Sequence, residues 1–168
     1  MKPEKLIEDL KSSAHQFVVT LRAFPQDRFN TRPAPDKWSA GEIAEHVAIL
    51  EDVVLPIVTG PGKPSGQQDE DKKLVLMRTA ILDLDTKYQA PSFVHPSADP
   101  KEAEALIARI LAAREALGHA VRGVDLSEIA TAAKHPVMGT LTRCEWVYTL
   151  IFHGERHRLQ IEGLKGRV

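Results

Sequence analysis

The amino-acid sequence predicts an all-α fold, a four-helix bundle with one short extra helix. Four long segments repeat apolar residues at helical spacing, segments rich in proline and glycine separate them, and very little alternates as a β-strand would. The chain has 168 residues, of which 43% are hydrophobic. This size and composition predict a single domain over residues 1–168 with its own core.

The first helix is predicted over residues 3–23, where apolar side chains recur every three or four positions. Pro3 suits its first turn, because the amide hydrogen that proline lacks has no partner inside a helix at that position. The segment 25–38, rich in proline, asparagine and aspartate, is expected to be a long connection.

The second helix is predicted from a start signal. Ser39 and Glu42 have the spacing of a capping box, in which each side chain accepts a hydrogen bond from the other residue's backbone amide. The helix is therefore expected to begin at Trp38 or Ser39. We expect it to end near Leu55, since Pro56 disfavours continuation.

The second half of the chain is predicted to hold a short helix and a long one. Residues 59–73 are rich in glycine, proline and charge and are expected to form a loop before a short helix over 74–88. Three prolines in residues 89–100 predict an ordered irregular segment. Residues 101–123 are strongly helix-forming and have an apolar stripe.

Composition excludes several classes of function. The chain has 22 Lys and Arg against 23 Asp and Glu, a net charge of −1, which gives no footprint for nucleic acid or an anionic membrane surface. No apolar stretch approaches the roughly 20 residues that span a bilayer, so a cytoplasmic protein is expected. The single Cys144 excludes an intrachain disulfide and a multi-cysteine zinc site, so seven histidines and the carboxylates are the available metal ligands.

The last helix carries two histidines at ligand spacing. It is expected to begin after a cap at Thr140 or Thr142 and to end near Leu164. His153 and His157 are separated by about 40° around the helix axis and about 6 Å along it, so both imidazoles can reach one metal ion. Both lie on the apolar stripe of the helix, which predicts that they face the core.

A third histidine is predicted to face the same core. His46 shares a stripe of the second helix with Ile43 and Leu50. Three buried imidazoles need partners for their ring nitrogens, and one divalent metal ion would serve all three. Hydrogen-bonded core histidines without a metal are the alternative interpretation.

The pattern is not that of a zinc protease, in which a glutamate directly follows the first histidine of HExxH. Here Gly154 follows His153, and Glu155 lies about 200° away around the helix. No general base is identified, although Glu42 and Gln160 lie about one turn from the histidines and are candidates to support the site or line its pocket, with capping favoured for Glu42. The sequence leaves two roles open for His135, a position near the metal site and a position in a turn. Glu45 and Asp52 are expected to be solvated, and His15, His95 and His119 to be structural or surface residues.

These residues resemble the DinB-like superfamily of metal-binding four-helix bundles, which includes the YfiT-type proteins. The resemblance rests on residues 38–47, the proline-bearing run 87–96, and residues 135–161, and covers nearly the full chain. It implies that the family's histidine triad falls on His46, His153 and His157. It also implies a bundle with crossover connections, for which the long segments 24–37 and 86–100 provide the length.

The resemblance implies a metal-dependent activity. Three imidazoles leave a coordination position open, and members of the superfamily are described as metal-dependent hydrolases or as transferases that use a low-molecular-weight thiol. Zinc or nickel is expected, with iron or manganese as alternatives, and the substrate is expected to be a small molecule. The competing hypothesis is a non-catalytic, stress-associated metal-binding module. The sequence leaves open whether such a module is a homodimer. A fourth protein ligand would favour that hypothesis.

Overall fold

The structure, a computed structural model, describes residues 2–66 and 70–168. These residues form five α-helices, two short 3-10 helices and one small antiparallel sheet. The α-helices are α1 Pro3–Arg22, α2 Ala40–Thr59, α3 Glu70–Leu82, α4 Ala103–Ala120 and α5 Arg143–Leu164. The 3-10 helices are η1 Gln26–Arg28 and η2 Ser92–Val94, and the strands are β1 Gly62–Lys63 and β2 Ile129–Ala130.

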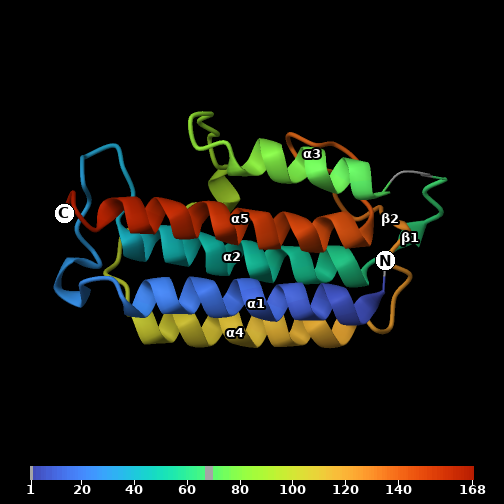
Figure 1. Cartoon of the computed structure of the whole chain (residues 1–168), viewed down its shortest axis with the longest axis horizontal. Coiled ribbons are helices and arrows are strands. Elements are labelled where there is room, and N and C mark those ends of the chain that lie inside the picture. The colour runs from blue at the N-terminus through green and yellow to red at the C-terminus, as the bar shows by residue number, and fades with distance from the viewer. Residues whose placement is uncertain (1, 67–69) are drawn as a thin grey trace.

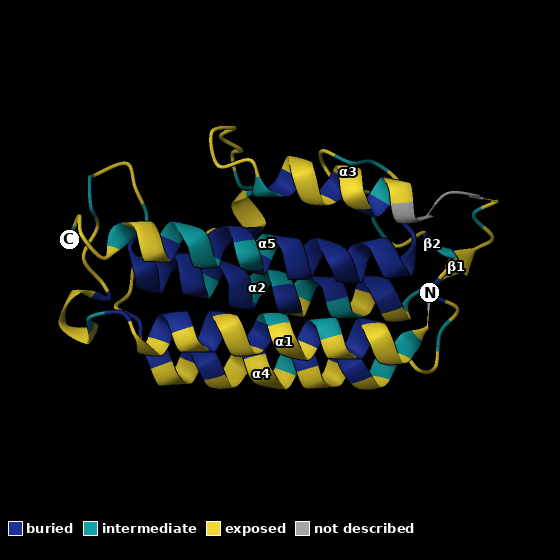
Figure 2. Ribbon diagram, in the orientation of Figure 1, coloured by how far each residue is buried: buried dark blue, intermediate teal, exposed yellow. Residues whose placement is uncertain are grey.

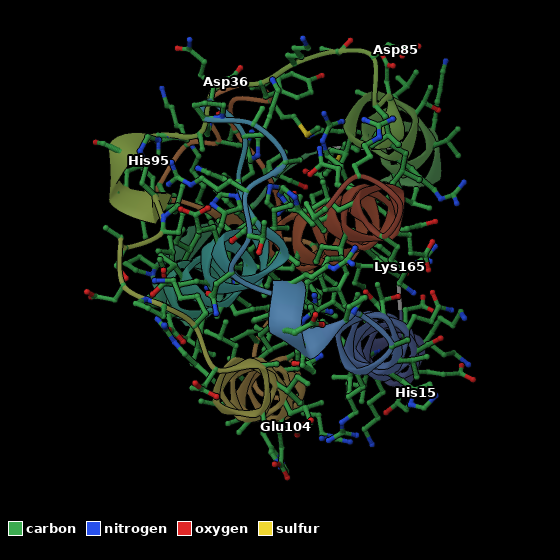
Figure 3. All side chains as sticks on the ribbon, turned by 90° about the vertical axis from the view of Figure 1, so that its left-hand side faces the viewer. His15, Asp36, Asp85, His95, Glu104 and Lys165 are labelled. Atoms are coloured by element: carbon green, nitrogen blue, oxygen red, sulfur yellow. The ribbon has the colours of Figure 1, made fainter. Side chains whose placement is uncertain are left out.

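The helices α1, α2, α4 and α5 form a four-helix bundle, which confirms the predicted fold class (Figure 1). Helix α2 packs between α4 and α5, and α1 packs between the same two helices on the other side, as the end-on view in Figure 3 shows. Consecutive helices α1 and α2 thus occupy opposite corners, so the chain crosses the end of the bundle between them and again between α4 and α5. The expected crossover connections are therefore present, the first over residues 24–37 as the sequence suggested, but the second over residues 121–142 rather than 86–100. Helix α3 packs on α5, outside the four.

Capping boxes begin both α2 and α5. The Ser39 hydroxyl accepts from the Glu42 amide at 3.2 Å, and the Glu42 carboxylate accepts from the Ser39 amide at 2.9 Å. At the start of α5, Thr142 and Glu145 make the same reciprocal pair, at 3.2 and 2.8 Å. The predicted cap at Ser39 is confirmed, and Thr142 rather than Thr140 caps the last helix.

The predicted end of α2 is wrong. The helix continues past Pro56 to Thr59. Pro56 is exposed, whereas Ile57 and Val58 in the same turn are buried. The burial of these side chains offsets the hydrogen bond that proline removes from the helix.

The predicted bounds of α3 are also wrong, since the helix covers Glu70–Leu82 rather than 74–88. Arg156 of α5 donates to the carbonyls of Ile81 and Asp83 at 2.7 and 2.6 Å, which satisfies carbonyl groups at the end of the helix. The Asp83 carboxylate then accepts from the Asp85 amide and the Thr86 hydroxyl, forming a turn. The sheet pairs Gly62–Lys63, in a segment predicted as loop, with Ile129–Ala130. Residues 89–100 are irregular apart from η2, as predicted.

The core consists of two separate apolar clusters along the bundle. The first includes residues 6–10 of α1, 54–58 of α2, 117 of α4 and 144–152 of α5, and the second includes residues 17–21, 40–48, 103–110 and 161 of the same four helices. Between them lie Ser13, Glu51, Arg114 and His153, one from each helix, which we call the polar layer.

Burial differs between the two pairs of helices. Figure 2 shows α2 and α5 buried over most of their length, whereas α1 and α4 alternate buried and exposed positions. Helix α3 covers one side of α5, and this extra layer explains part of the difference. No helix in the described residues is both long enough and apolar enough to span a membrane.

Candidate metal centre

Three imidazoles converge between α2 and α5. One ring nitrogen from each of His46, His153 and His157 lies within 4.8 Å of the others. The Nε2 atoms of His153 and His157 are 3.2 Å apart, and the ring centre of His46 is 5.1 and 5.0 Å from the other two. The structure therefore brings together the three histidines that helical spacing placed on inward faces.

Two of these imidazoles are oriented through Nδ1. His46 Nδ1 lies 2.7 Å from the carbonyl oxygen of Val94 in η2, and His157 Nδ1 lies 2.7 Å from Gln160 Oε1. Because both oxygens only accept, each Nδ1 carries the hydrogen and each Nε2 keeps a lone pair. Metal-binding histidines are typically held in this way. Gln160 thus supports His157, one of the two roles open to it from the sequence.

The third imidazole, that of His153, has a ring nitrogen without a hydrogen-bond partner among the described residues. The Nδ1 atom of His153 is buried and has no hydrogen-bond partner among the described residues. Its Nε2 atom lies 3.2 Å from that of His157, and two tetrahedral nitrogen ligands on one zinc ion would be about 3.3 Å apart. The nitrogen arrangement therefore fits a single divalent ion with modest side-chain adjustment.

Burial keeps these imidazoles neutral. Burial lowers the pKa of His157 to about 3, and the neighbouring His46 adds to the effect. The pKa of His153 lies well below its usual value for the same reason, and that of His46 is also lowered by burial. Neutral imidazole is the form that binds metal, so protons compete little for this site at neutral pH.

The donor set is that of an open site. Among the side chains that the structure describes, no aspartate, glutamate or cysteine joins the three histidines at comparable distance. His46 and His157 are 3% and 7% exposed, whereas His153 is half-buried. Three protein ligands with a further position free is the arrangement of catalytic rather than closed structural zinc sites.

An aromatic side chain, Trp38, packs against the three-histidine centre. The half-buried Trp38 ring lies 5.0 Å from the His46 ring and 5.9 Å from the His95 ring, between centroids. His95 is exposed, and its Nε2 atom lies 2.8 Å from the Ala90 carbonyl oxygen. Trp38 therefore shields one side of His46.

The remaining histidines lie outside the group. His135 has a turn role, because its Nδ1 accepts from the amides of Val137 and Met138 at 3.2 and 3.1 Å, while its ring packs 5.6 Å from Trp146. His15, His95 and His119 are exposed, and Figure 3 shows the first two at the periphery.

The carboxylates near the histidines already have partners. Glu42 completes its capping box and pairs with Arg32. Glu45 is not solvated as expected, because it lies 2.8 Å from Lys101 Nζ and accepts from the Ser97 amide at 2.7 Å.

Two further carboxylates pair with arginines. Asp52 is partly exposed, as expected, and pairs with Arg109. Glu155 lies 3.5 Å from Arg78 of α3, consistent with its place away from the histidines. The geometry, like the sequence, identifies no general base.

Among the buried charged residues that sequence reasoning missed are Glu51 and Arg114, which are 2% and 6% exposed. A signal was present. On α2 the buried positions 44, 47, 51, 54 and 58 follow helical spacing with glutamate in the middle. On α4 positions 103, 107, 110, 114 and 117 do the same with arginine among them. A negative charge on the buried stripe of one helix and a positive charge on the buried stripe of another together predict a buried ion pair.

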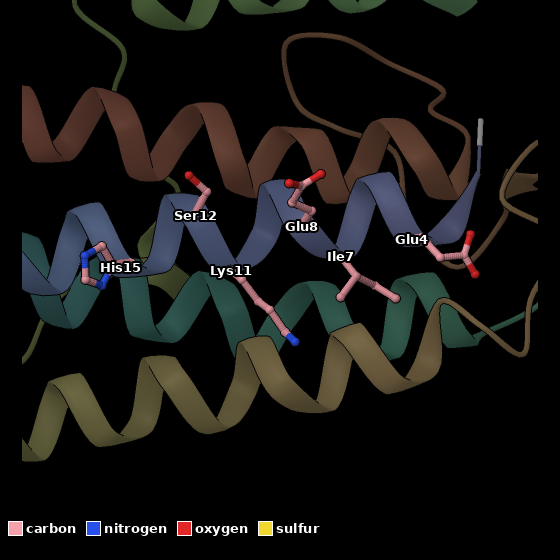
Figure 4. A pocket seen from close by; sticks show the side chains of 6 residues that line it. All are labelled: Glu4, Ile7, Glu8, Lys11, Ser12 and His15. Carbon is pink, nitrogen blue, oxygen red and sulfur yellow. The ribbon is translucent and has the colours of Figure 1, made fainter.

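The surface hollow along α1 does not coincide with the three-histidine centre. A shallow hollow lies along α1 and is lined by residues of that helix alone (Figure 4). Those residues are Glu4, Ile7, Glu8, Lys11, Ser12 and His15. Figure 4 shows their side chains spread in different directions rather than converging, and none of the three clustered histidines takes part.

Known proteins resemble the chain over nearly its whole length. An uncharacterized protein, YuaE of Bacillus subtilis (strain 168), is 22% identical over 149 residues, which cover 88% of this chain and 90% of YuaE. The crystal structure of TT2238, a four-helix bundle protein, matches with a TM-score of 0.59 and 19% identity, covering 96% of this chain and 99% of that one. The sequence profile of the DinB superfamily matches residues 9–161. The chain therefore belongs to the DinB superfamily.

Proposed function

We propose that the chain binds one divalent metal ion through His46, His153 and His157 and acts on a small molecule there, as a hydrolase or as a thiol-dependent transferase. One observation carries this proposal. The three neutral imidazoles converge within 4.8 Å, and hydrogen bonds at Nδ1 leave Nε2 as the atom that carries the lone pair in His46 and His157. Membership of the DinB superfamily supports the metal site.

The three-histidine donor set suits zinc or nickel, with iron or manganese as alternatives. When bound, such an ion lowers the pKa of a coordinated water or thiol and so supplies a nucleophile near neutral pH. The chain's own residues hold the imidazoles in place. Val94 and Gln160 fix two of the rings, and Trp38 shields His46 from water on one side.

A non-catalytic role for the metal is the second candidate. The histidines come from two helices, so an ion held by all three would link α2 to α5. An ion that binds only the folded state would then stabilise the bundle by mass action. The two candidates differ in turnover, not in metal content.

Metal content of the untagged protein tests the site. About one divalent ion per chain is expected, lost in the His153→Ala/His157→Ala double variant. A His15→Ala/His119→Ala variant is the matched control, because both of those imidazoles are exposed. A native protein that contains no metal and takes up neither zinc nor nickel contradicts the proposal.

Turnover is tested on the same preparations. Metal-loaded and metal-stripped protein would be screened with ester, amide and thiol-transfer substrates, and sedimentation would test for a homodimer. Activity present only in the loaded form supports the enzyme. Increased thermal stability on loading, without turnover of any substrate class, favours the stabilising role.

A further inference from the structure

A buried ion pair, Arg114–Glu51, connects all four bundle helices. Arg114 of α4 donates from Nε to Glu51 Oε1 of α2 at 2.6 Å. The same guanidinium donates to the carbonyl of Leu10 in α1 at 3.4 Å and to that of Leu150 in α5 at 3.2 Å. One side chain thus contacts the three other helices of the bundle.

These contacts lie beside the histidines in the chain. Glu51 follows His46 by five residues on α2, and Leu150 precedes His153 by three residues on α5. Both distances are about one and a half helical turns or less. Arg114 therefore joins the two helices that supply the imidazoles, next to the turns that supply them.

A glycine makes this approach possible. A Cβ atom on Gly154, the residue after His153, would lie 3.3 Å from Arg114 Nη2 and 3.7 Å from Ser13 Oγ. The first distance is tighter than ordinary packing, and Arg114 is held by three partners and has little freedom to move. Glycine is a poor helix former, so its place inside α5 is better explained by this contact than by helix stability. In HExxH helices this position holds the glutamate.

Stability alone is a weak explanation for the pair. Burying two charges costs desolvation free energy that their attraction often fails to recover, and apolar replacements of similar volume are frequently as stable. In addition, Glu51 Oε2 is buried and has no hydrogen-bond partner among the described residues. The pair is thus only partly satisfied, although apolar clusters lie on both sides of it.

We infer that Arg114 and Glu51 are positioning residues for the three-histidine centre, and that Gly154 gives Arg114 the room to act. The pair fixes α5 against α2 in the register that makes the Nε2 atoms of His46, His153 and His157 converge. It does not touch the metal. This inference rests on the proposed metal site and assigns to that site a set of supporting residues on α2, α4 and α5.

Cobalt(II) is the probe, because its visible absorption spectrum reports ligand geometry. Gly154→Ala is compared with Gly163→Ala, a matched control in the same helix whose added Cβ meets nothing within 4 Å. The Glu51→Leu/Arg114→Met double variant removes the pair without leaving an unpaired charge. Circular dichroism and thermal unfolding of the metal-free proteins check that each variant folds.

Gly154→Ala and the double variant are expected to fold, to bind cobalt about tenfold or more weakly, and to show a shifted visible spectrum. Gly163→Ala is expected to keep the wild-type affinity and spectrum. If Gly154→Ala folds and matches wild type in both respects, the positioning role is overturned, whether or not the double variant folds. A wild-type protein that binds no cobalt, zinc or nickel overturns the metal site itself, and the positioning role with it.

Discussion

The two apolar clusters and the Glu51–Arg114 pair of the polar layer are buried to a similar degree but respond differently to change. Leu21 and Glu51 are 0% and 2% exposed, yet the first needs only neighbours of suitable shape, whereas the second needs a partner charge. Burial raises the pKa of Glu51, and Arg114 opposes that shift. The comparison teaches that the clusters stabilise the bundle through packing, whereas the polar layer restricts how the helices can be placed.

The largest effect is expected from breaking the buried pair on one side only. Arg114→Met should lower the free energy of unfolding by about 3–5 kcal/mol, because it leaves the Glu51 carboxylate buried without its partner. Urea unfolding of the metal-free protein measures this. The Glu51→Leu/Arg114→Met double variant should recover most of the loss, and equal losses in both variants would contradict the account.

A truncation in an apolar cluster should cost less and leave the site intact. Leu21→Ala in the second cluster is expected to lower the free energy of unfolding by about 3 kcal/mol, from lost burial and the cavity left behind. Isothermal titration with zinc should give an affinity within about twofold of wild type, since the folded variant keeps its polar layer. A large loss of affinity would show that the clusters and the site are not separable.

Acid should weaken the metal-free protein through the histidines. The unfolded chain takes up protons as the pH falls below about 6.5, whereas folded His157 stays neutral until its pKa of about 3. The stability contributed by neutral His157 is therefore complete above pH 6.5 and is lost as pH falls toward 3, with about 2 kcal/mol lost by pH 5. Unfolding curves at pH 7.5 and 5 measure it. His157→Gln should flatten this dependence, and the control His119→Gln, on an exposed side chain, should not.

The smallest effect is expected at the helix starts. Ser39→Ala and Thr142→Ala should each lower the free energy of unfolding by about 1 kcal/mol, because each removes an acceptor for a backbone amide. Both caps lie at ends of the bundle, outside the polar layer, so zinc affinity should not change. Thermal unfolding and titration of the two variants check these expectations, and a change in affinity would extend the region that positions the histidines.

Much of the fold was predictable because its signals are local. The capping box at Ser39, the helical spacing of His153 and His157, and the proline-rich connections each depend on residues close in sequence. The same local rules failed where distant residues decide. Helix α2 continues past Pro56 because Ile57 is buried against the rest of the bundle. Helix α3 ends where Arg156, more than 70 positions away in the sequence, donates to its last carbonyl groups.

The candidate site divides in the same way. The three histidines were predictable because an inward imidazole is conspicuous on an apolar stripe. Glu51 and Arg114 were missed because charged residues on helices are usually solvated, and only the pairing of two separate helices reveals their burial. The hydrogen bond from His46 to Val94 was beyond prediction, because it depends on where an irregular segment docks.

The crossover connections also decide when the histidine cluster can form during synthesis. Helix α1 packs beside α4 and α5, and α2 beside the same two helices, so each early helix meets its neighbours only after later parts of the chain are made. Domains assemble as the ribosome releases them, and contacts between distant segments form late. His46 therefore has no partner imidazoles until α5, the last helix of the bundle, has docked. Tight metal uptake would then report that the whole bundle has been synthesised and has folded. A nascent or truncated chain lacking α5 would present only one of the three clustered histidines, His46.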